Sequence, residues 1–386
     1  MVLETFVYLD YNATSPARPE VMEIVAETLS IGPVNPSSGH RYGREARRRI
    51  EKARSEVADL VGAKADQVIF TMGGTEANNL VLKGYDCDQY VVSAAEHAAV
   101  IETVSVISEE VHLVPVCENG LVDLGALESM LKASNMVTLV SVMTANNETG
   151  VLQPIPKVVE IAKRYGAKVH TDAVQAAGKI TLDFLNWDVD FMTLSAHKIG
   201  GPQGVGAIIC QDRNLLRPTM LGGGQEGGLR AGTENVAGIA GFGVASKLAM
   251  AEAQEHSIGV AMLRDNMEAT LRSKVPEMKI FGECVSRLPN TSCLTMPGVR
   301  NDKQVMAFDL AGVAISAGSA CSAGKLHSSH VLEAMGVAAD EANTMIRVSM
   351  GVGSTKCDLE QFIKIWLDIS ARKNNFGSQK LIQSVA

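Results

Sequence analysis

The sequence has few aromatic residues, no excess of basic residues and no long apolar segment. Phe, Trp and Tyr make up 4% of the 386 residues, and the formal net charge is -8 at pH 7. Because binding to nucleic-acid phosphates depends on a basic surface, this charge argues against nucleic acid as the main partner. The longest apolar candidate, residues 136–145, is interrupted by hydroxyl side chains and is far shorter than the ~20 residues of a membrane span. We therefore expect no membrane segment.

The cysteines are scattered and form no CxxC pair. There are 7 of them, and an odd, dispersed set predicts reduced thiols and not a disulfide framework. The N-terminal stretch has no basic region and carries an acid at Glu4, which is not typical of a secretory signal. Without a CxxC pair or an HExxH motif, we predict no metal site. Together these features predict a cytoplasmic location.

Length and patterning indicate an α/β protein with two domains. A chain of 386 residues exceeds one ordinary hydrophobic core. Between Val68 and Cys210, strand-like segments alternate with helical ones, which is typical of a mainly parallel sheet covered by helices on both faces. A polar segment at residues 254–257 separates a helix ending near Ala253 from another beginning at Val260. We expect a large domain at residues 14–254 and a smaller α+β domain at residues 1–13 and 255–386.

One predicted strand leads directly into a lysine. It ends in Ser195-Ala-His-Lys198 and is followed by glycines, so the lysine amine would lie at the edge of the sheet. A lysine that loses solvent there can act as a nucleophile and form a Schiff base. A lysine in a glycine-rich loop is more often simply solvated, so this signal is weak by itself.

Four other predicted strands also end in polar groups. Ligands bind at the carboxyl ends of strands in sheets of this kind, so we take all five ends as one site. The groups are Gly73-Gly74-Thr75-Glu76, Glu96-His97, Asn146-Asn147-Glu148, and Asp172 with Gln175.

These residue types favour pyridoxal phosphate as the cofactor. Lys198 would form the Schiff base, and Asp172 would keep the ring nitrogen protonated, so that the ring can accept electrons. His97 would stack on the ring and move protons, and Gln175 would donate to the ring hydroxyl.

The phosphate group would bind where a strand passes into a helix. Backbone N–H groups at Gly74 and Thr75 and the start of the helix attract a dianion, and Ser195 and His197 would complete the cradle. Each of these residues by itself could be a helix cap or an ordinary polar residue. Their coincidence at the strand ends favours the site.

Two further glycine-rich stretches resemble phosphate-binding motifs without the required context. Gly222–Gly227 matches GxGxxG but does not follow a strand, which argues against a dinucleotide fold. Gly318–Lys325 resembles a P-loop with one residue too many, and Leu326 stands where Ser or Thr would bind magnesium. This second stretch holds Cys321 among small residues, which predicts an exposed thiol that could act as a nucleophile. A spare exposed cysteine is the alternative.

With these motifs assembled, the chain resembles the cysteine desulfurases of the class V aminotransferase family, fold type I, and most of all their nitrogen-fixation and iron-sulfur-cluster branch. The likeness runs from Tyr8-Leu-Asp-Tyr-Asn-Ala-Thr14 to Arg347-Val-Ser-Met-Gly351. It implies a large domain with a mainly parallel seven-stranded sheet, pyridoxal 5'-phosphate as cofactor and a homodimer. It further implies Lys198, Cys321 and His97 as catalytic residues, Gly74, Thr75, Asn147, Asp172, Gln175, Ser195, His197, Lys198 and Thr233 as cofactor-binding residues, and Asn35 and Arg347 at the substrate carboxylate.

The resemblance also implies a reaction and partners. L-cysteine would be converted to L-alanine with a persulfide on Cys321, and the sulfur would pass to an acceptor or iron-sulfur scaffold protein. Thr233 would reach the phosphate bound by the other subunit of the dimer. Gly227 and His327-Ser328 depart from residues common in the family, which bears on loop stiffness and partner choice.

Alternatives to this reaction remain open. A selenocysteine lyase or a transaminase could use the same lysine site, and Cys321 discriminates, because a transaminase would not need it. A non-catalytic sulfur carrier with the same fold is a further alternative, and the presence of Lys198, Asp172 and His97 argues against it.

Overall fold

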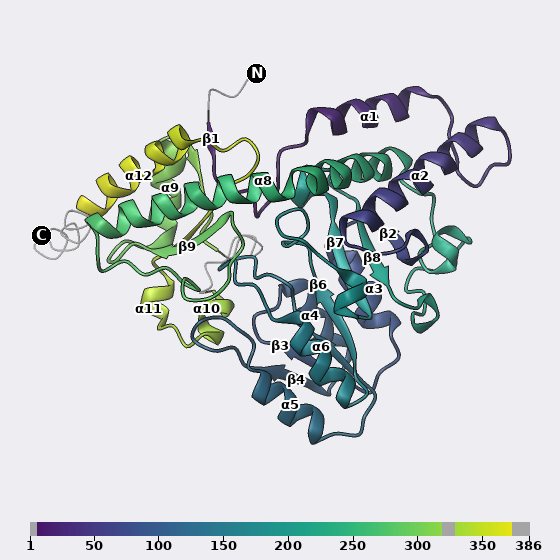
Figure 1. Cartoon of the computed structure of the whole chain (residues 1–386), viewed down its shortest axis with the longest axis horizontal. Helices are drawn as coiled ribbons and strands as arrows, with labels where there is room; N and C mark the ends of the chain where they lie inside the picture. Colours follow the sequence, from purple (N-terminus) through teal and green to yellow (C-terminus); the bar gives the residue numbers. More distant parts are fainter. Residues whose placement is uncertain (1–5, 319–328, 373–386) are drawn as a thin grey trace, which may run out of the picture.

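A seven-stranded sheet forms the centre of the larger part of the molecule (Figure 1). The structure, a computed structural model, describes residues 6–318 and 329–372, apart from the side chains of residues 254–256. The strand order is β2-β8-β7-β6-β5-β3-β4, and β8 runs in the direction opposite to the other six strands. The predicted mainly parallel seven-stranded sheet is therefore confirmed. The strands are β2 (Val68–Thr71), β3 (Gln89–Ser93), β4 (Val111–Val114), β5 (Thr138–Ser141), β6 (Lys168–Asp172), β7 (Phe191–Ser195) and β8 (Gly206–Cys210).

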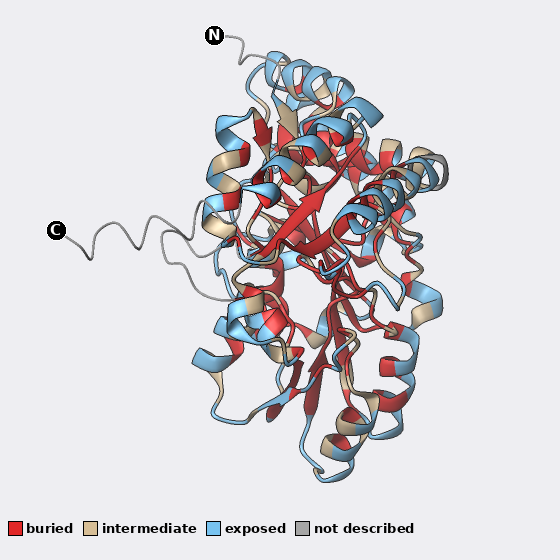
Figure 2. Ribbon diagram, turned by 90° about the vertical axis from the view of Figure 1, so that its left-hand side faces the viewer, coloured by how far each residue is buried: buried red, intermediate tan, exposed pale blue. Residues whose placement is uncertain are grey.

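The central strands are buried on both faces because helices cover the sheet on both sides (Figure 2). Successive side chains of a strand point to opposite faces. On β2, Val68 and Phe70 accordingly belong to one buried apolar cluster and Ile69 to another. The helices of this part are α1 (Pro19–Ser30), α2 (Arg41–Leu60), α3 (Gly74–Gly84), α4 (Ala98–Ile107), α5 (Leu124–Lys132), α6 (Ile155–Arg164) and α7 (Phe184–Trp187).

The long helix α8 (Val236–Lys274) connects this part to a second apolar core (Figure 1). Phe242 packs in the core beside the sheet, whereas Met267 packs in the second core. The predicted break between two helices at residues 254–257 is wrong. That segment is polar but contains neither Pro nor Gly, so nothing in its backbone preference ends a helix. The predicted domain boundary at residue 254 falls inside α8 and stays a prediction.

The second core is built from C-terminal elements and the N-terminal strand. Strand β1 (Val7–Tyr8) pairs in parallel with β10 (Val313–Ala314), so the start of the chain lies beside its C-terminal part. Phe308 and Phe362 stack at this core with ring centroids 4.9 Å apart. The remaining elements are β9 (Thr291–Thr295) and β11 (Met345–Ser349), which pair antiparallel, and α9 (Asn301–Leu310), α10 (His330–Ala334), α11 (Ala339–Ala342) and α12 (Lys356–Ala371).

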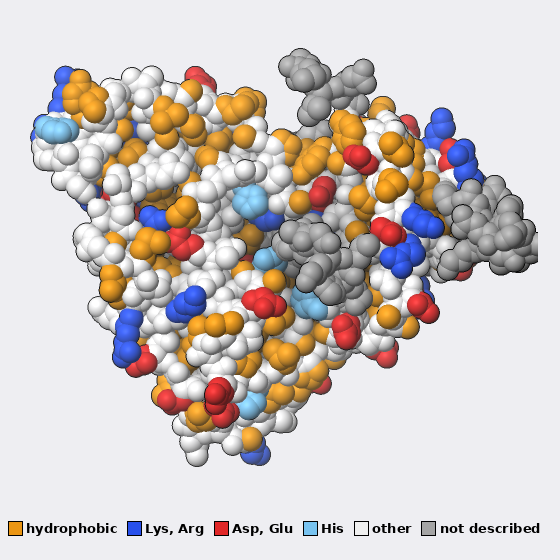
Figure 3. Space-filling view, turned by 180° about the vertical axis from the view of Figure 1, so that it is seen from behind, with side chains coloured by type: hydrophobic (Ala, Val, Ile, Leu, Met, Phe, Trp, Pro, Cys, Tyr) orange, Lys and Arg blue, Asp and Glu red, His pale blue; other side chains and the backbone are white. Residues whose placement is uncertain are grey.

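Part of α8 is an apolar segment of 18 residues, longer than residues 136–145. By length and composition Val236–Ala253 could cross a membrane, but 61% of it is buried inside the protein. It contributes Val236, Phe242 and Ala245 to the core beside the sheet. Its apolar character is therefore explained by packing. On the face shown in Figure 3, acidic and basic side chains are interspersed, in line with the absence of a basic excess in the sequence.

Candidate active site

The polar strand ends predicted from the sequence meet at one cavity of about 260 Å³. A second cavity, of about 710 Å³, adjoins it and shares Thr75, Ser195 and His197 in its lining. Side chains from distant parts of the chain thus face one space. The polar residues lining the first cavity are Thr75, Asn78, His97, Asn147, Asp172, Gln175, Ser195, His197 and Lys198, and Gly74 also lines it.

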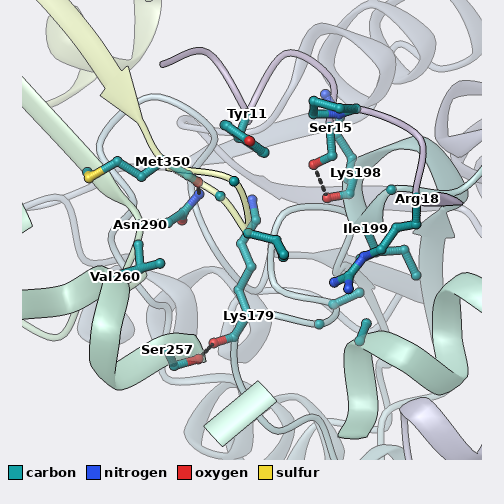
Figure 4. Close-up of a pocket in the computed structure, with 18 of the residues that line it drawn as sticks. Tyr11, Ser15, Arg18, Lys179, Lys198, Ile199, Ser257, Val260, Asn290 and Met350 are labelled. Carbon is teal, nitrogen blue, oxygen red and sulfur yellow. Dashed lines mark hydrogen bonds between the residues drawn. The ribbon is translucent and has the colours of Figure 1, made fainter. Parts of the chain in front are cut away.

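Lys198 is held by the turn that follows β7. A short 3-10 helix, η2 (Ala196–Ile199), carries the lysine and ends at Gly200, whose φ of 80° favours glycine. The Lys198 amine donates hydrogen bonds to the backbone oxygens of Asn12 at 2.6 Å and Ala13 at 2.7 Å. Ser15 binds the backbone oxygen of Lys198 at 2.8 Å (Figure 4). The predicted Schiff-base lysine is therefore positioned by the N-terminal segment.

Asp172 is the buried carboxylate of the cavity. It ends β6 and accepts hydrogen bonds from Asn78 Nδ2 at 2.8 Å and from the backbone N–H of Val174 at 2.9 Å. Both donors are neutral, so a further, protonated partner in the cavity would stabilise the buried charge. In the described part of the chain, the Asn78 oxygen Oδ1 is buried without a hydrogen-bond partner. This corner of the cavity can therefore take a polar ring.

His97 begins helix α4 and lines the same cavity. Its ring nitrogen Nδ1 accepts a hydrogen bond from the backbone N–H of Ala99 at 3.0 Å. In a neutral ring the proton therefore lies on Nε2. The residue before it, Glu96, is fully buried, and burial raises the pKa of its carboxyl well above the usual range, helped by the charge of Asp172.

Two further histidines near the strand ends are kept neutral by burial. Burial and the charge of Lys198 lower the pKa of His197 to about 4, and its Nδ1 lies 3.0 Å from Thr14 Oγ1. Burial also lowers the pKa of His170 to about 4. Neither histidine ring carries a positive charge at neutral pH, so both rings contribute hydrogen bonds and not charge.

The start of helix α3, where the sequence predicts a phosphate cradle, lines the adjoining cavity. Gly73 precedes the helix with a φ of 152°, and no side chain of the described residues caps the helix start. A Cβ atom on Gly74 would lie 3.0 Å from Val174 Cγ2, so glycine permits the close approach of the helix to the cavity wall. Backbone N–H groups at a helix start attract anions. The adjoining cavity has room for one.

Arg347 lies on β11 and reaches the cavity wall from the second core. It donates to the backbone oxygen of Asn147 at 2.9 Å and to Asp10 Oδ1 at 2.7 Å. The side chain is 3% exposed, and within the described residues its buried Nε has no partner. The arginine thus stands beside Asn147, which lines the cavity.

Some predicted residues are not brought to the cavities. Asn35 is exposed in the loop between α1 and α2, and its Oδ1 accepts from the backbone N–H of Ser37. Thr233 is exposed and lines a different cavity together with Arg230. Cys321 lies outside the described residues. The roles predicted for these three residues stay predictions.

Sequence reasoning missed polar residues that support the site. Asn12 binds several of its members, and Asn78 binds Asp172. Lys179 donates to Gln175 at 2.8 Å. A signal was available for the last two, since Asn78 follows Thr75 by three residues and Lys179 follows Gln175 by four, which is helical or turn spacing.

Comparison with known proteins decides the family. The aminotransferase class-V family matches residues 7–362. This chain belongs to that family. It is 39% identical over 368 residues to the cysteine desulfurase IscS of Dictyoglomus turgidum, covering 93% of each chain. It is 38% identical to the IscS-like cysteine desulfurase of Mycobacterium tuberculosis, covering 93% of this chain and 94% of the relative. A NifS-like protein from Rickettsia africae superposes with a TM-score of 0.88 at 39% identity, covering 94% of this chain and 99% of that one.

Within the class-V family the chain lies among the cysteine desulfurases of the iron-sulfur branch, which depend on pyridoxal phosphate. The residues present fit this cofactor. Asp172 offers a buried carboxylate beside the Asn78 oxygen, which has no partner in the part of the chain that the structure describes. Lys198 offers an amine, and the start of α3 offers an anion site. Within residues 6–318 and 329–372, no group of three His, Cys, Asp or Glu side chains could hold a metal ion.

Proposed function

We propose that this protein is a homodimeric cysteine desulfurase that converts L-cysteine to L-alanine. The sulfur would remain as a persulfide on Cys321 and then pass to an acceptor or scaffold protein for iron-sulfur cluster assembly. The observation that carries the proposal is the convergence of Lys198, Asp172 and His97 on one cavity. The family membership of the chain supports it.

Each residue of the cavity would have a defined role toward the cofactor. Lys198 would hold it covalently, Asp172 would pair with the ring nitrogen, and Gln175 and Asn147 would lie near the ring hydroxyl. When bound, pyridoxal phosphate supplies an electron sink that stabilises negative charge on the substrate carbon.

The phosphate end would be held by backbone and hydroxyl groups. Gly74 and Thr75 at the start of α3, with Ser195 and His197, line the cavity that adjoins the ring site. Thr233 from the partner subunit would complete the phosphate site in the dimer.

Proton transfer and substrate binding fall to four other side chains. Arg347 and Asn35 would bind the substrate carboxylate, and Arg347 is well placed for this because it already lies against Asn147. Lys198 and His97 would move protons, and the His97 ring can hold one on Nε2 while Nδ1 is occupied by Ala99.

Cys321 would accept the sulfur. Its thiolate would attack the substrate sulfur, so that an S–S bond forms as the C–S bond breaks, and the substrate carbon then takes a proton to give alanine. The described residues on both sides of the Cys321 segment support this placement. Ser329 donates to Glu148 at 2.6 Å, and a Cβ on Gly318 would lie 3.0 Å from the same carboxylate, one residue from Asn147.

The proposed location is the cytoplasm. A reduced set of free cysteines and transfer of persulfide sulfur by thiol exchange both suit a reducing compartment. Fractionation of the native host, with detection of this chain, would test the location.

The function is tested by measuring alanine and sulfide release from L-cysteine in the presence of a thiol reductant. Wild type is compared with Cys321→Ala and with Cys117→Ala, which removes another exposed cysteine. We expect equal amounts of alanine and sulfide from wild type and Cys117→Ala, and neither product from Cys321→Ala despite bound cofactor. Full activity of Cys321→Ala would exclude the persulfide mechanism and favour a lyase or a transaminase.

A further inference from the structure

Lys179 is a second lysine beside the site, and the reaction proposed above assigns it no role. It follows β6 by a short turn, and its backbone oxygen accepts a hydrogen bond from Ser257 at 2.7 Å. Its side chain extends between Asn290 and Lys198 (Figure 4). Lys179 lines a cavity of about 220 Å³ that shares Lys198 with the cofactor cavity, but Lys179 is not among the residues that line the cofactor cavity itself.

The Lys179 amine binds the oxygens of two amide side chains. It donates to Gln175 Oε1 at 2.8 Å and to Asn12 Oδ1 at 3.0 Å. The two ends of an amide have nearly the same shape, so a neighbour decides which end faces which way. Because an ammonium group can only donate, it favours both oxygens on the Lys179 side, and Asn290 Nδ2 also donates to Asn12 Oδ1 at 3.1 Å.

The other ends of these two amides are then directed toward the site. Gln175 Nε2 donates to the backbone oxygen of Asn12 at 2.9 Å, and Lys198 donates to the same oxygen. Asn12 Nδ2 donates to Thr291 at 2.9 Å and to the backbone oxygen of Asn147 at 3.3 Å. Lys179 therefore contacts Gln175 directly and is connected through Asn12 to Lys198 and Asn147.

The position of Lys179 is electrostatically unfavourable for a charged side chain. Burial lowers the pKa of the Lys179 amine well below its usual range, and the charges of Lys198 and Arg347 lower it further. An apolar side chain of similar length would avoid this cost. The amine donates hydrogen bonds to the two amide oxygens, which an apolar side chain could not do.

We infer that Lys179 is a positioning residue, which orients the Gln175 amide toward the cofactor and holds Asn12 against Lys198. It acts through these residues and does not touch the substrate. The inference rests on the proposed function, because it assigns Lys179 to the same site. Without the amine, the bond from Gln175 Nε2 to the Asn12 backbone oxygen would be left to orient the Gln175 amide alone.

The test is a double-mutant cycle between Lys179 and Gln175. Lys179→Met is made in the wild type and in Gln175→Ala, and Lys179→Arg serves as the conservative variant. An exposed lysine, Lys356→Met, is the matched control. Alanine release gives kcat and KM, and visible circular dichroism of the cofactor-loaded protein reports how the ring is held, independently of turnover.

We expect Lys179→Met to lower kcat roughly 10- to 100-fold, the range for losing a hydrogen bond to a charged group, with KM nearly unchanged. The visible circular dichroism should change with it. In the Gln175→Ala background the same substitution should change both quantities much less, because only the contact with Asn12 remains to be lost. Lys179→Arg, which can donate to both oxygens, should recover most of the activity, and Lys356→Met should match wild type.

Other results would overturn the inference. Equal effects of Lys179→Met in both backgrounds would mean that Lys179 does not act through Gln175. A lowered melting temperature with unchanged kcat and unchanged circular dichroism would make it a structural residue only. If Lys179→Met does not fold, Lys179→Gln, which can donate to one oxygen, replaces it. If wild type releases no alanine, the proposed function fails, and the circular dichroism cycle alone decides the role of Lys179.

Discussion

Replacing Asp172 with Asn should remove most of the activity while leaving the fold intact. In the native protein, Asp172 Oδ1 accepts from the backbone N–H of Val174 and Oδ2 accepts from Asn78 Nδ2. An Asn at this position keeps the first contact but presents an NH2 group to Asn78. The Asn78 amide can turn over, because its buried Oδ1 has no partner among the described residues. We therefore expect Asp172→Asn to cost less than about 1 kcal/mol of unfolding free energy.

The loss of activity follows from the loss of charge. A carboxylate and a protonated ring nitrogen about 4 Å apart attract each other by about 4 kcal/mol at the effective dielectric constant near a protein surface. If this attraction is made mainly when negative charge develops on the substrate, its loss lowers kcat by about a hundred- to a thousandfold.

The assay is alanine release at saturating cysteine, with thermal melting and visible absorbance to confirm folding and bound cofactor. Asp190→Asn is the matched control, because Asp190 is also buried and also accepts a backbone N–H, that of Val169 at 2.9 Å, but does not line the cavity. We expect this variant to stay active. A cofactor-loaded Asp172→Asn protein with kcat within tenfold of wild type would refute the pairing of Asp172 with the ring.

Three further outcomes follow from the same structure. Arg347→Lys keeps the charge but loses the planar guanidinium group that binds Asn147 and Asp10. KM for cysteine should therefore rise about tenfold with little change in kcat, and an unchanged KM would contradict a role of Arg347 at the substrate carboxylate. Burial lowers the pKa of His170 from 6.5 to about 4, so the unfolded chain takes up the proton first as the pH falls. The unfolding free energy should therefore drop by about 3 kcal/mol between these two pH values, and in urea titrations the His170→Gln variant should lack this drop. Phe308→Ala breaks the stack with Phe362 and leaves a cavity, which should cost about 3–5 kcal/mol of unfolding free energy, and a loss below about 1 kcal/mol would show that the second core does not depend on this stack.

Much of the fold could be predicted from local patterns. Apolar runs such as Phe191–Leu194 lie in β7, because a strand buried on both faces needs apolar residues without alternation. The error at residues 254–257 has a physical reason as well. Polar residues mark exposure, whereas a helix ends where backbone geometry or capping ends it, and α8 continues to Lys274.

The candidate site was predictable where it depends on strand ends. Asp172 ends a strand, and Lys198 and His97 follow strands. The carboxyl ends of parallel strands meet at one edge of a sheet, so the convergence of these residues could be expected. The supporting residues depend on contacts across long sequence distances. Asn12 binds Lys198 and Gln175 from the N-terminal segment, and Arg347 reaches Asn147 from β11, and no local pattern indicates such pairs.

The sequence by itself thus determined the α/β architecture, the residues able to hold a pyridoxal cofactor and the cysteine proposed to take the sulfur, because these depend on residue type, periodicity and short motifs. Only the tertiary structure decided how the amine of Lys198 is held, which nitrogen of His97 is occupied, and that Lys179 lies against Gln175 and Asn12. The physical reason is that hydrogen-bond partners and burial are set by the packing of distant segments, and these two effects fix the charge and orientation of each group.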